Sequence, residues 1–266
     1  MSEDPIEVDM NDKHVMVMRY DPKAKFVLVS AKVKEQVGAL ADLTKILAIR
    51  GIDILEGHIY VSDAPEGYVT LFAASADSRM DANFVKQILQ GSTYLESLTV
   101  IGGSRGAIID SVNFPLIGGL NQRSILVTAA TARDLMSRAK EKWGKEADEI
   151  IYEMGAEWGE AGWSGMISAL GGDRESLQEY LQLFSAVGIG RAFVERFKPT
   201  GPSAVVSVQR LFECEGVRSD KPGSSFFRGI IAGCTSSLFG KKMTAMETSC
   251  LAMGDKECRF KATASE

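Results

Sequence analysis

The order of strand-like and helix-like segments between Phe26 and Gly103 restricts the fold of this chain more than any other feature. Within "VGALADLTKILAIRGIDI", the residues Leu40, Leu43 and Leu47 recur on one face of a helix. A strand-like segment, "FVLVSAKV", precedes this helix, and two more follow it around the turn "DAPEG". A second helix, "DANFVKQILQG", then leads into the strand-like "LESLTVIGG". The resulting β-α-β-β-α-β order predicts a ferredoxin-like domain in an α+β protein.

A domain boundary is expected at the glycine-rich joint "GGSRG", residues 102–106. A chain of 266 residues is long enough for two modest domains that each bury a core. Residues 1–24 are predicted to form an N-terminal tail and a strand, and residues 25–103 the ferredoxin-like domain. Residues 104–266 are left for a second domain.

The second domain is expected to mix helices and strands. The segments "AIIDSVNF" and "RSILVTAA" predict two strands, and a mainly helical stretch follows from about Thr131 to Leu170. Asp173 is expected to cap a further helix. Two more strands lead to the helix "SSFFRGIIAGCTSSLFG", and the chain then forms a hairpin that turns at Gly254 and Asp255.

Composition and charge exclude several classes of partner. The formal net charge is −5, and the densest basic stretch, Arg133–Lys145, alternates with acidic residues as a solvated helix face does. Direct nucleic-acid binding needs a basic stripe and is not expected. No apolar run reaches the roughly 18 residues that a membrane span needs, and the acidic N-terminus has no apolar signal segment. The expected location is the cytoplasm, with no membrane partner.

No residue is assigned a catalytic role. The chain has two histidines, of which His14 lies near the N-terminus and His58 lies in a predicted strand. The G-x-G of "VGIGRAF" lacks a third glycine and closes a helix, so a dinucleotide site is not expected.

The segment "KEQVGALADL", with Gly38 and Leu40, marks the turn from the first strand of the ferredoxin-like domain into its first helix. On this motif, residues 25–103 resemble the ACT domain, a regulatory module that usually binds amino acids and commonly pairs with a second copy. Glycine would let a ligand carboxylate approach the backbone N–H groups at the helix N-terminus. The residues that the resemblance implies for amino-acid binding are Glu35, Gln36, Val37, Gly38 and Ala39. The alternative is that Gly38 only eases a tight turn.

Three segments of the second domain carry a stronger resemblance: "IIYEMGAEWGEAGW", "FFRGIIAGCTSSLFG" and "METSCLAMGDKECRF". On these, residues 104–266 resemble the 4-vinyl reductase-type domain, also called the hydrocarbon-binding domain. The resemblance implies a mixed α/β plait related to that of TRAPP vesicle-tethering subunits, a dimer formed through helices, and an apolar pocket. Some members of the family sense phenolic compounds in transcriptional activators, and others accompany tetrapyrrole synthesis.

A row of glycines points to the place of such a pocket. Gly155, Gly159 and Gly162 share one helix face, although each costs a helix about 1 kcal/mol relative to alanine. The row implies either close approach of another backbone or space left for a ligand. The pocket hypothesis places the ligand against the "FFRGIIAG" helix. The expected lining residues are Gly155, Trp158, Gly159, Gly162, Trp163, Phe226 and Phe227. The alternative is a glycine-lined contact between two helices with aromatic core residues around it.

The string "METSCLAMGDKEC" holds Glu247, Cys250 and Cys258 in an E-x2-C-x7-C pattern. A hairpin centred on Gly254 sets the two cysteines opposite each other. Glu247 is three residues from Cys250 and would face the other side of a regular strand, so joint binding of a metal requires a bulge. Zinc, a disulfide and reduced packed thiols all remain open on this pattern.

In phenol-sensing relatives this string supplies three zinc ligands, and a cysteine at the start of the preceding helix supplies the fourth. Here that position is Ser224, and a hydroxyl is a poor zinc ligand beside a thiolate. Cys214, on the preceding strand, is a possible replacement. Any metal is expected to be held by Glu247, Cys250 and Cys258, more weakly than in four-ligand relatives.

These observations favour a ligand-sensing regulatory protein. It would bind a small apolar or aromatic molecule in the second domain and an amino acid in the first. A homodimer is expected, because both domain types self-associate and two-fold dimers are the commonest homo-oligomers. An effector protein would supply the output. The alternatives are an enzyme or accessory factor in tetrapyrrole vinyl-group metabolism, for which the sequence shows no hydride-donor site, and a purely structural dimer.

Overall fold

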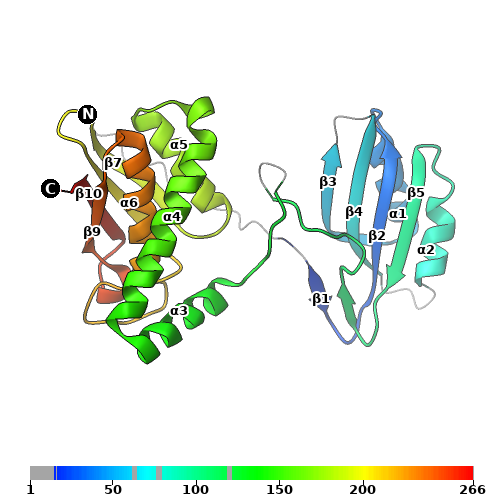
Figure 1. Ribbon diagram of the computed structural model, residues 1–266. Coiled ribbons are helices and arrows are strands. Elements are labelled where there is room, and N and C mark those ends of the chain that lie inside the picture. Colours follow the sequence, from blue (N-terminus) through cyan, green and yellow to red (C-terminus); the bar gives the residue numbers. More distant parts are fainter. Residues whose placement is uncertain (1–14, 16, 62–64, 76–79, 119–121, 266) are drawn as a thin grey trace. The chain divides into compact units, whose positions relative to one another are not determined.

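The structure, a computed structural model, describes the chain except for residues 1–14, 16, 62–64, 76–79, 119–121 and 266, and the side chains of residues 166–170. The predicted N-terminal tail and His14 lie outside the described residues. The chain divides into two compact units, Met1–Ile125 and Leu126–Glu266 (Figure 1). The division falls beyond the boundary expected at residues 102–106. The reason is that strand β6 (Ala107–Ile109) pairs antiparallel with strand β1 (Met18–Tyr20) and so belongs to the first unit.

The N-terminal unit is built on a four-stranded antiparallel sheet in the order β3-β4-β2-β5. Its strands are β2 (Lys25–Lys34), β3 (Asp53–Val61), β4 (Glu66–Ser75) and β5 (Leu95–Gly102). Helix α1 (Ala39–Ile49) connects β2 to β3, and helix α2 (Ala82–Leu89) connects β4 to β5. The β-α-β-β-α-β order and the antiparallel pairing confirm the ferredoxin-like prediction.

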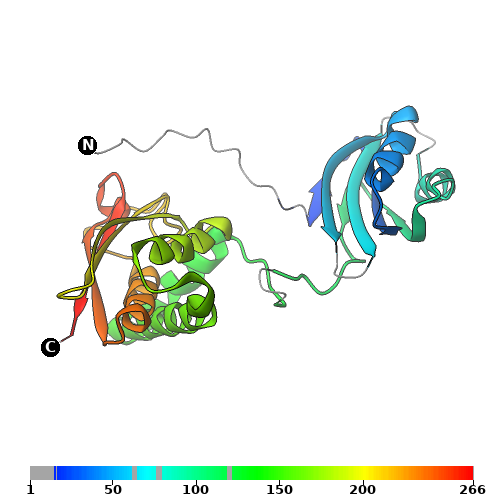
Figure 2. The same ribbon diagram turned by 90° about the horizontal axis from the view of Figure 1, so that it is seen from above.

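Both faces of this sheet bury apolar side chains. On the face that carries α1 and α2 (Figure 2), Leu43 and Leu47 are fully buried against strand residues such as Val29, as the helical period predicted. The opposite face holds a smaller cluster in which Phe72 packs with Ile108 of β6. The β1–β6 pair therefore closes part of the face that the two helices leave open.

The C-terminal unit places helices on a second four-stranded antiparallel sheet, ordered β7-β8-β10-β9. Its strands are β7 (Arg191–Lys198), β8 (Ser203–Gln209), β9 (Met243–Ser249) and β10 (Cys258–Ala264). Its helices are α3 (Ala129–Trp143), α4 (Lys145–Leu170), α5 (Arg174–Ala186) and α6 (Ser225–Phe239). Helix α6 packs on β9 and β10 and also lies along α4 (Figure 1), and α5 packs on β7. Together with the first unit this is the predicted α+β class.

One predicted strand is wrong. The segment "RSILVTAA" forms no strand, and its last two residues begin helix α3. The Oγ1 atom of Thr128 accepts a hydrogen bond from the backbone N–H of Thr131 at 3.1 Å and so caps this helix. The segment "AIIDSVNF" is a strand only as far as Ile109, because the Asp110 carboxylate accepts from the backbone N–H groups of Val112 and Asn113 and turns the chain.

The expected helix caps are present. Asp173 accepts a hydrogen bond from the backbone N–H of Ser176 at 2.9 Å, and Asp81 accepts one from that of Phe84 at 2.7 Å. In the described part of the chain, no helix is both long and apolar enough to cross a membrane.

Candidate functional site

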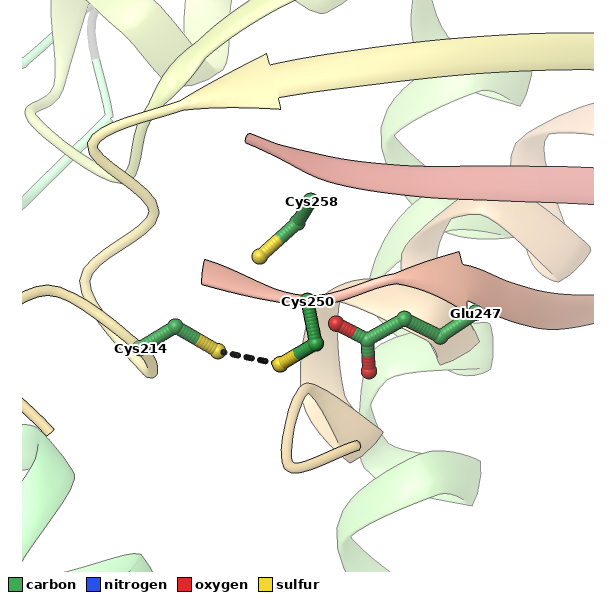
Figure 3. A group of neighbouring side chains, drawn as sticks. All are labelled: Cys214, Glu247, Cys250 and Cys258. Atoms are coloured by element: carbon green, nitrogen blue, oxygen red, sulfur yellow. Dashed lines mark hydrogen bonds between the residues drawn. The ribbon is translucent and has the colours of Figure 1, made fainter. Parts of the chain in front are cut away.

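Three connections at one end of the C-terminal sheet bring four possible metal ligands together (Figure 3). Cys214 lies in the turn after β8, Glu247 lies in β9, Cys250 follows β9 directly, and Cys258 begins β10. One ligand atom from each residue lies within 4.8 Å of the others. All four residues are buried. We call them the ligand cluster.

A β-bulge allows Glu247 to join the cluster. In the pairing of β9 with β10, Arg259 lies opposite Ser249 and Phe260 lies opposite Glu247, so Thr248 is an extra residue on β9. This is the irregularity that joint binding required of the sequence, because one added residue changes the face on which a side chain lies. The same register, continued by one step, places Cys258 opposite Cys250, as the hairpin geometry predicted.

The donor set and its spacing fit zinc. Tetrahedral Zn²⁺ takes cysteine sulfur at about 2.3 Å, which separates two sulfurs by about 3.8 Å. The Sγ atoms of Cys214 and Cys250 lie 3.6 Å apart. Thiolates select soft or borderline ions over magnesium or calcium. The residues that would hold the ion are those of the ligand cluster, so Cys214 completes the three-residue set expected from the sequence.

The thiols of the cluster differ in acidity. Hydrogen bonding with Cys258, and more weakly with Ser224 and Cys250, lowers the pKa of the Cys214 thiol to about 6 against the effect of burial. Burial raises the pKa of Cys250 to about 11. Hydrogen bonding with Cys214, together with burial, raises the pKa of Cys258 far above its usual range. The cluster thus favours one thiolate beside protonated thiols, and an ion that binds all three sulfurs must displace protons.

Two buried carboxylates satisfy the first N–H groups of helix α6. Glu247 accepts from the backbone N–H of Ser224 at 3.1 Å. Glu213 accepts from the backbone N–H groups of Phe226 at 3.1 Å and Phe227 at 2.8 Å. Burial raises the pKa of Glu213 to about 8, and the two N–H groups oppose that rise. Sequence reasoning missed Glu213, although an acid between apolar residues in "RLFECE" was a signal that it is buried.

The glycine row is a contact between two helices. A Cβ atom on Gly155 or Gly159 of α4 would collide with backbone atoms of α6, and one on Gly229 or Gly233 of α6 would collide with backbone atoms of α4. Gly162 faces the ring of Tyr180 instead. The predicted ligand space between these two helices is therefore filled by backbone at these glycines, and close approach explains their presence.

The predicted aromatic residues do come together, through two side chains of α5. Ring contacts run from Trp158 to Phe226 (5.4 Å between centroids) and to Phe184 (6.3 Å). Phe184 also contacts Phe227 at 5.9 Å and Tyr180 at 5.3 Å. Tyr180 in turn contacts Trp163 at 5.3 Å. We call these six residues the aromatic cluster: Trp158, Trp163, Tyr180, Phe184, Phe226 and Phe227.

Within the aromatic cluster, one polar group has no partner. Trp163 is fully buried, and among the described residues its Nε1–H finds no hydrogen-bond acceptor. The hydroxyl of the neighbouring Tyr180, by contrast, donates to the carbonyl oxygen of Gly159 at 3.1 Å. Buried donors are almost always paired, so this indole N–H calls for an explanation.

Two open hollows lie elsewhere on the described surface. One, of about 280 Å³, is bordered by Tyr152 and Arg228 of α4 and α6 together with the start of β9. The other, of about 400 Å³, lies between α1 and the start of β3. None of the predicted lining residues borders either hollow.

The loop predicted to bind an amino acid lies at the start of α1. Residues 35–38 are exposed and Ala39 is buried. Gly38 has φ of +98°, a conformation that favours glycine, so the turn alone accounts for that residue. Amino-acid binding and the ACT resemblance stay predictions.

Comparison with known proteins supports the resemblance in the C-terminal unit. The vinyl-4-reductase domain family matches residues 204–264. No curated protein matches the chain in sequence. Among solved structures, the phenol-responsive sensory domain of the transcription activator PoxR, in complex with phenol, is 22% identical with a TM-score of 0.49; the match covers 54% of this chain and 78% of that one.

Two further structures have the predicted kinds of fold. A vinyl-4-reductase family protein from Methanocaldococcus jannaschii is 20% identical with a TM-score of 0.38, over 54% of this chain and 85% of that one. A trafficking protein particle complex subunit 3 from Naegleria fowleri, covalently bound to palmitic acid, is 14% identical with a TM-score of 0.41, over 52% and 93%. The segment that matches the vinyl-4-reductase domain family, residues 204–264, contains the whole ligand cluster.

Proposed function

We propose that the C-terminal unit is a small-molecule-binding regulatory domain built around a structural zinc centre. The observation that carries the proposal is the ligand cluster: three buried thiols and a buried carboxylate converge within 4.8 Å, in the segment that resembles vinyl-4-reductase domains. Buried ionisable groups of this kind are costly unless they are paired or bind a metal.

The closed donor set supports a structural role for the ion. Four protein ligands complete tetrahedral zinc, whereas catalytic zinc sites keep one position for water or substrate. When bound, the ion would supply stability to the connections that carry its ligands. This arrangement favours a binding or regulatory domain over a zinc hydrolase.

The aromatic cluster supports binding of an aromatic molecule with a hydrogen-bond acceptor. Edge-to-face rings form most of the cluster and would offer the same geometry to a ligand ring. The indole N–H of Trp163 is the donor that such an acceptor would satisfy. Trp158 is 48% exposed and connects the cluster to the surface. A phenol has both the ring and the oxygen, and is the first compound to test.

Metal analysis of the purified full chain tests the zinc centre. We expect one zinc per chain, lost on Cys214→Ser, Cys250→Ser and Cys258→Ser. Cys234→Ser is the matched control, because Cys234 is equally buried in the same unit but its thiol donates to the carbonyl of Ile231, outside the cluster. Zinc that stays tightly bound in the Cys214 variant would refute the four-ligand centre and return the assignment to Glu247, Cys250 and Cys258.

Calorimetric titration with phenol and with toluene tests the ligand site. Trp163→Phe keeps a ring and removes the N–H. A net hydrogen bond of about 0.5–1.5 kcal/mol predicts that this variant binds phenol roughly 2–13-fold more weakly, with toluene binding unchanged. Trp143→Phe, at an exposed tryptophan of α3, is the control. Equal affinity of parent and Trp163→Phe for phenol would refute the role given to the indole.

We propose a homodimer as the oligomeric state, supported by one feature of α4. Ile150, Met154 and Trp158 are exposed and recur every fourth residue, so they form an apolar stripe along one helix face. Light scattering of the full chain should give twice the monomer mass of 28.8 kDa. A monomer at micromolar concentration would contradict the dimer and leave the zinc and ligand proposals standing.

A further inference from the structure

Ser224 lies among the metal ligands without being one of them. It precedes the first residue of α6 and is 2% exposed. Its Oγ atom lies 2.7 Å from Oε1 of Glu247, 3.0 Å from Sγ of Cys214 and 3.8 Å from Sγ of Cys258. Its backbone N–H donates to Oε2 of the same glutamate at 3.1 Å. One residue therefore contacts three of the four members of the ligand cluster.

The two hydrogen bonds to Glu247 fix the orientation of its carboxylate. The hydroxyl donates to one oxygen and the backbone N–H donates to the other, so the carboxylate plane cannot rotate without losing a bond. The hydroxyl proton also has the Cys214 sulfur within reach, and both acceptors are anionic when they bind a metal. A hydroxyl in this place thus stabilises the ligands in their metal-binding form.

We propose that Ser224 is a positioning residue of the zinc centre, which orients Glu247 and Cys214 and couples the centre to the first turn of helix α6. The inference rests on the proposed zinc centre. Outer-shell partners of metal ligands typically contribute 10–100-fold to metal affinity. Because the N–H of Ser224 is one of the otherwise unpaired donors of α6, movement of Glu247 onto or away from a metal changes how that helix begins.

The neighbouring serine offers a matched control. Ser225 is also buried, at 4% exposure, and also lies in the first turn of α6. Its hydroxyl accepts from Nζ of Lys140 at 2.8 Å and donates to Asp148, away from the ligand cluster. Loss of either hydroxyl removes a buried hydrogen bond, but only loss of the Ser224 hydroxyl removes one from a metal ligand.

The experiment measures zinc affinity of the full chain by chelator competition, and the absorption spectrum of the cobalt-substituted protein. Ser224→Ala is expected to weaken zinc binding 10–100-fold while the thiolate-to-cobalt absorption at saturation keeps its intensity. Ser225→Ala should stay within about twofold of the parent, and Ser224→Thr, which keeps a hydroxyl, should recover most of the affinity. Unchanged affinity in Ser224→Ala, or an equal loss in Ser225→Ala, would overturn the proposal.

A double variant separates this inference from the zinc centre itself. Because Oγ of Ser224 lies within 3.8 Å of three cluster members, a sulfur at residue 224 would reach the ion. Cys214→Ser with Ser224→Cys should therefore bind zinc more tightly than Cys214→Ser alone, and no recovery would contradict the placement of Ser224. If the parent itself binds no zinc, the zinc centre fails and Ser224 has no ion to position.

Discussion

Replacing Gly233 by alanine should destabilise the C-terminal unit, against the usual effect of this change in a helix. A Cβ atom at this position would lie 2.8 Å from the carbonyl carbon of Ala156 and 2.9 Å from the backbone nitrogen of Glu160. Ordinary carbon contacts begin at about 3.5 Å, so α4 and α6 would have to separate by at least about 0.7 Å. A gap of that size forfeits roughly a quarter to a half of the dispersion energy of each affected contact.

Gly165→Ala provides the reference for the magnitude. Gly165 also lies in α4, but nothing lies within 4 Å of an added Cβ atom there. Both substitutions gain the same helix propensity, up to about 1 kcal/mol, so this gain cancels in the comparison. The difference between the two variants then reports overpacking, which costs typically about 1–3 kcal/mol. We expect Gly165→Ala to be more stable than the parent and Gly233→Ala to be less stable.

Urea unfolding followed by tryptophan fluorescence measures this difference. All three tryptophans of the chain, Trp143, Trp158 and Trp163, lie in the C-terminal unit, so the signal reports that unit alone. The expected result is a lower midpoint for Gly233→Ala with an unchanged slope. A Gly233→Ala protein as stable as Gly165→Ala would refute the inference that backbone contact explains the glycines.

Three further predictions concern other parts of the chain. Leu47→Ala should destabilise the N-terminal unit by about 2–5 kcal/mol in calorimetry, because Leu47 is fully buried, whereas Ile49→Ala, at a residue 70% exposed, should have little effect. Glu213→Gln should lower the midpoint of the tryptophan-reported transition by the equivalent of about 1–3 kcal/mol, since an amide offers one oxygen to the two N–H groups that the carboxylate now satisfies; an unchanged midpoint would contradict this capping role. The backbone N–H and the hydroxyl of Ser176 lower the pKa of Asp173, so this cap stabilises the fold above the unfolded pKa of about 3.8 and is lost as pH falls through the lower folded value. Asp173→Ala should therefore unfold at lower urea than the parent at pH 7, with the gap closing in acid, and a gap that does not depend on pH would argue against a charged cap.

Local patterns predicted the elements whose signals lie close together in sequence. The leucine spacing of α1, the aspartate caps of α2 and α5 and the hairpin about Gly254 are local, and the structure contains all of them. The predicted strand near Ile125 failed because its β-branched residues outweighed a single helix-capping threonine.

The candidate site depended on contacts that no local pattern carries. Cys214 reaches Cys250 only because the turn after β8 folds over the end of β9, and a cysteine so far upstream gives no spacing signal. The glycine row was ambiguous for another reason. A glycine that admits a second backbone and a glycine that leaves room for a ligand look the same in sequence, and only the position of α6 decides between them.

The placement of the ligand cluster has a consequence for chain entropy. Cys214 and Cys250 are 36 residues apart along the chain, and an ion held by both would act as a cross-link that closes this loop. Closing a loop of that length with a covalent cross-link removes unfolded-state entropy worth roughly 4 kcal/mol at 25 °C. A stabilisation of this size is a large fraction of what a single domain has, so the lifetime of the folded C-terminal unit would follow the supply of metal in its surroundings.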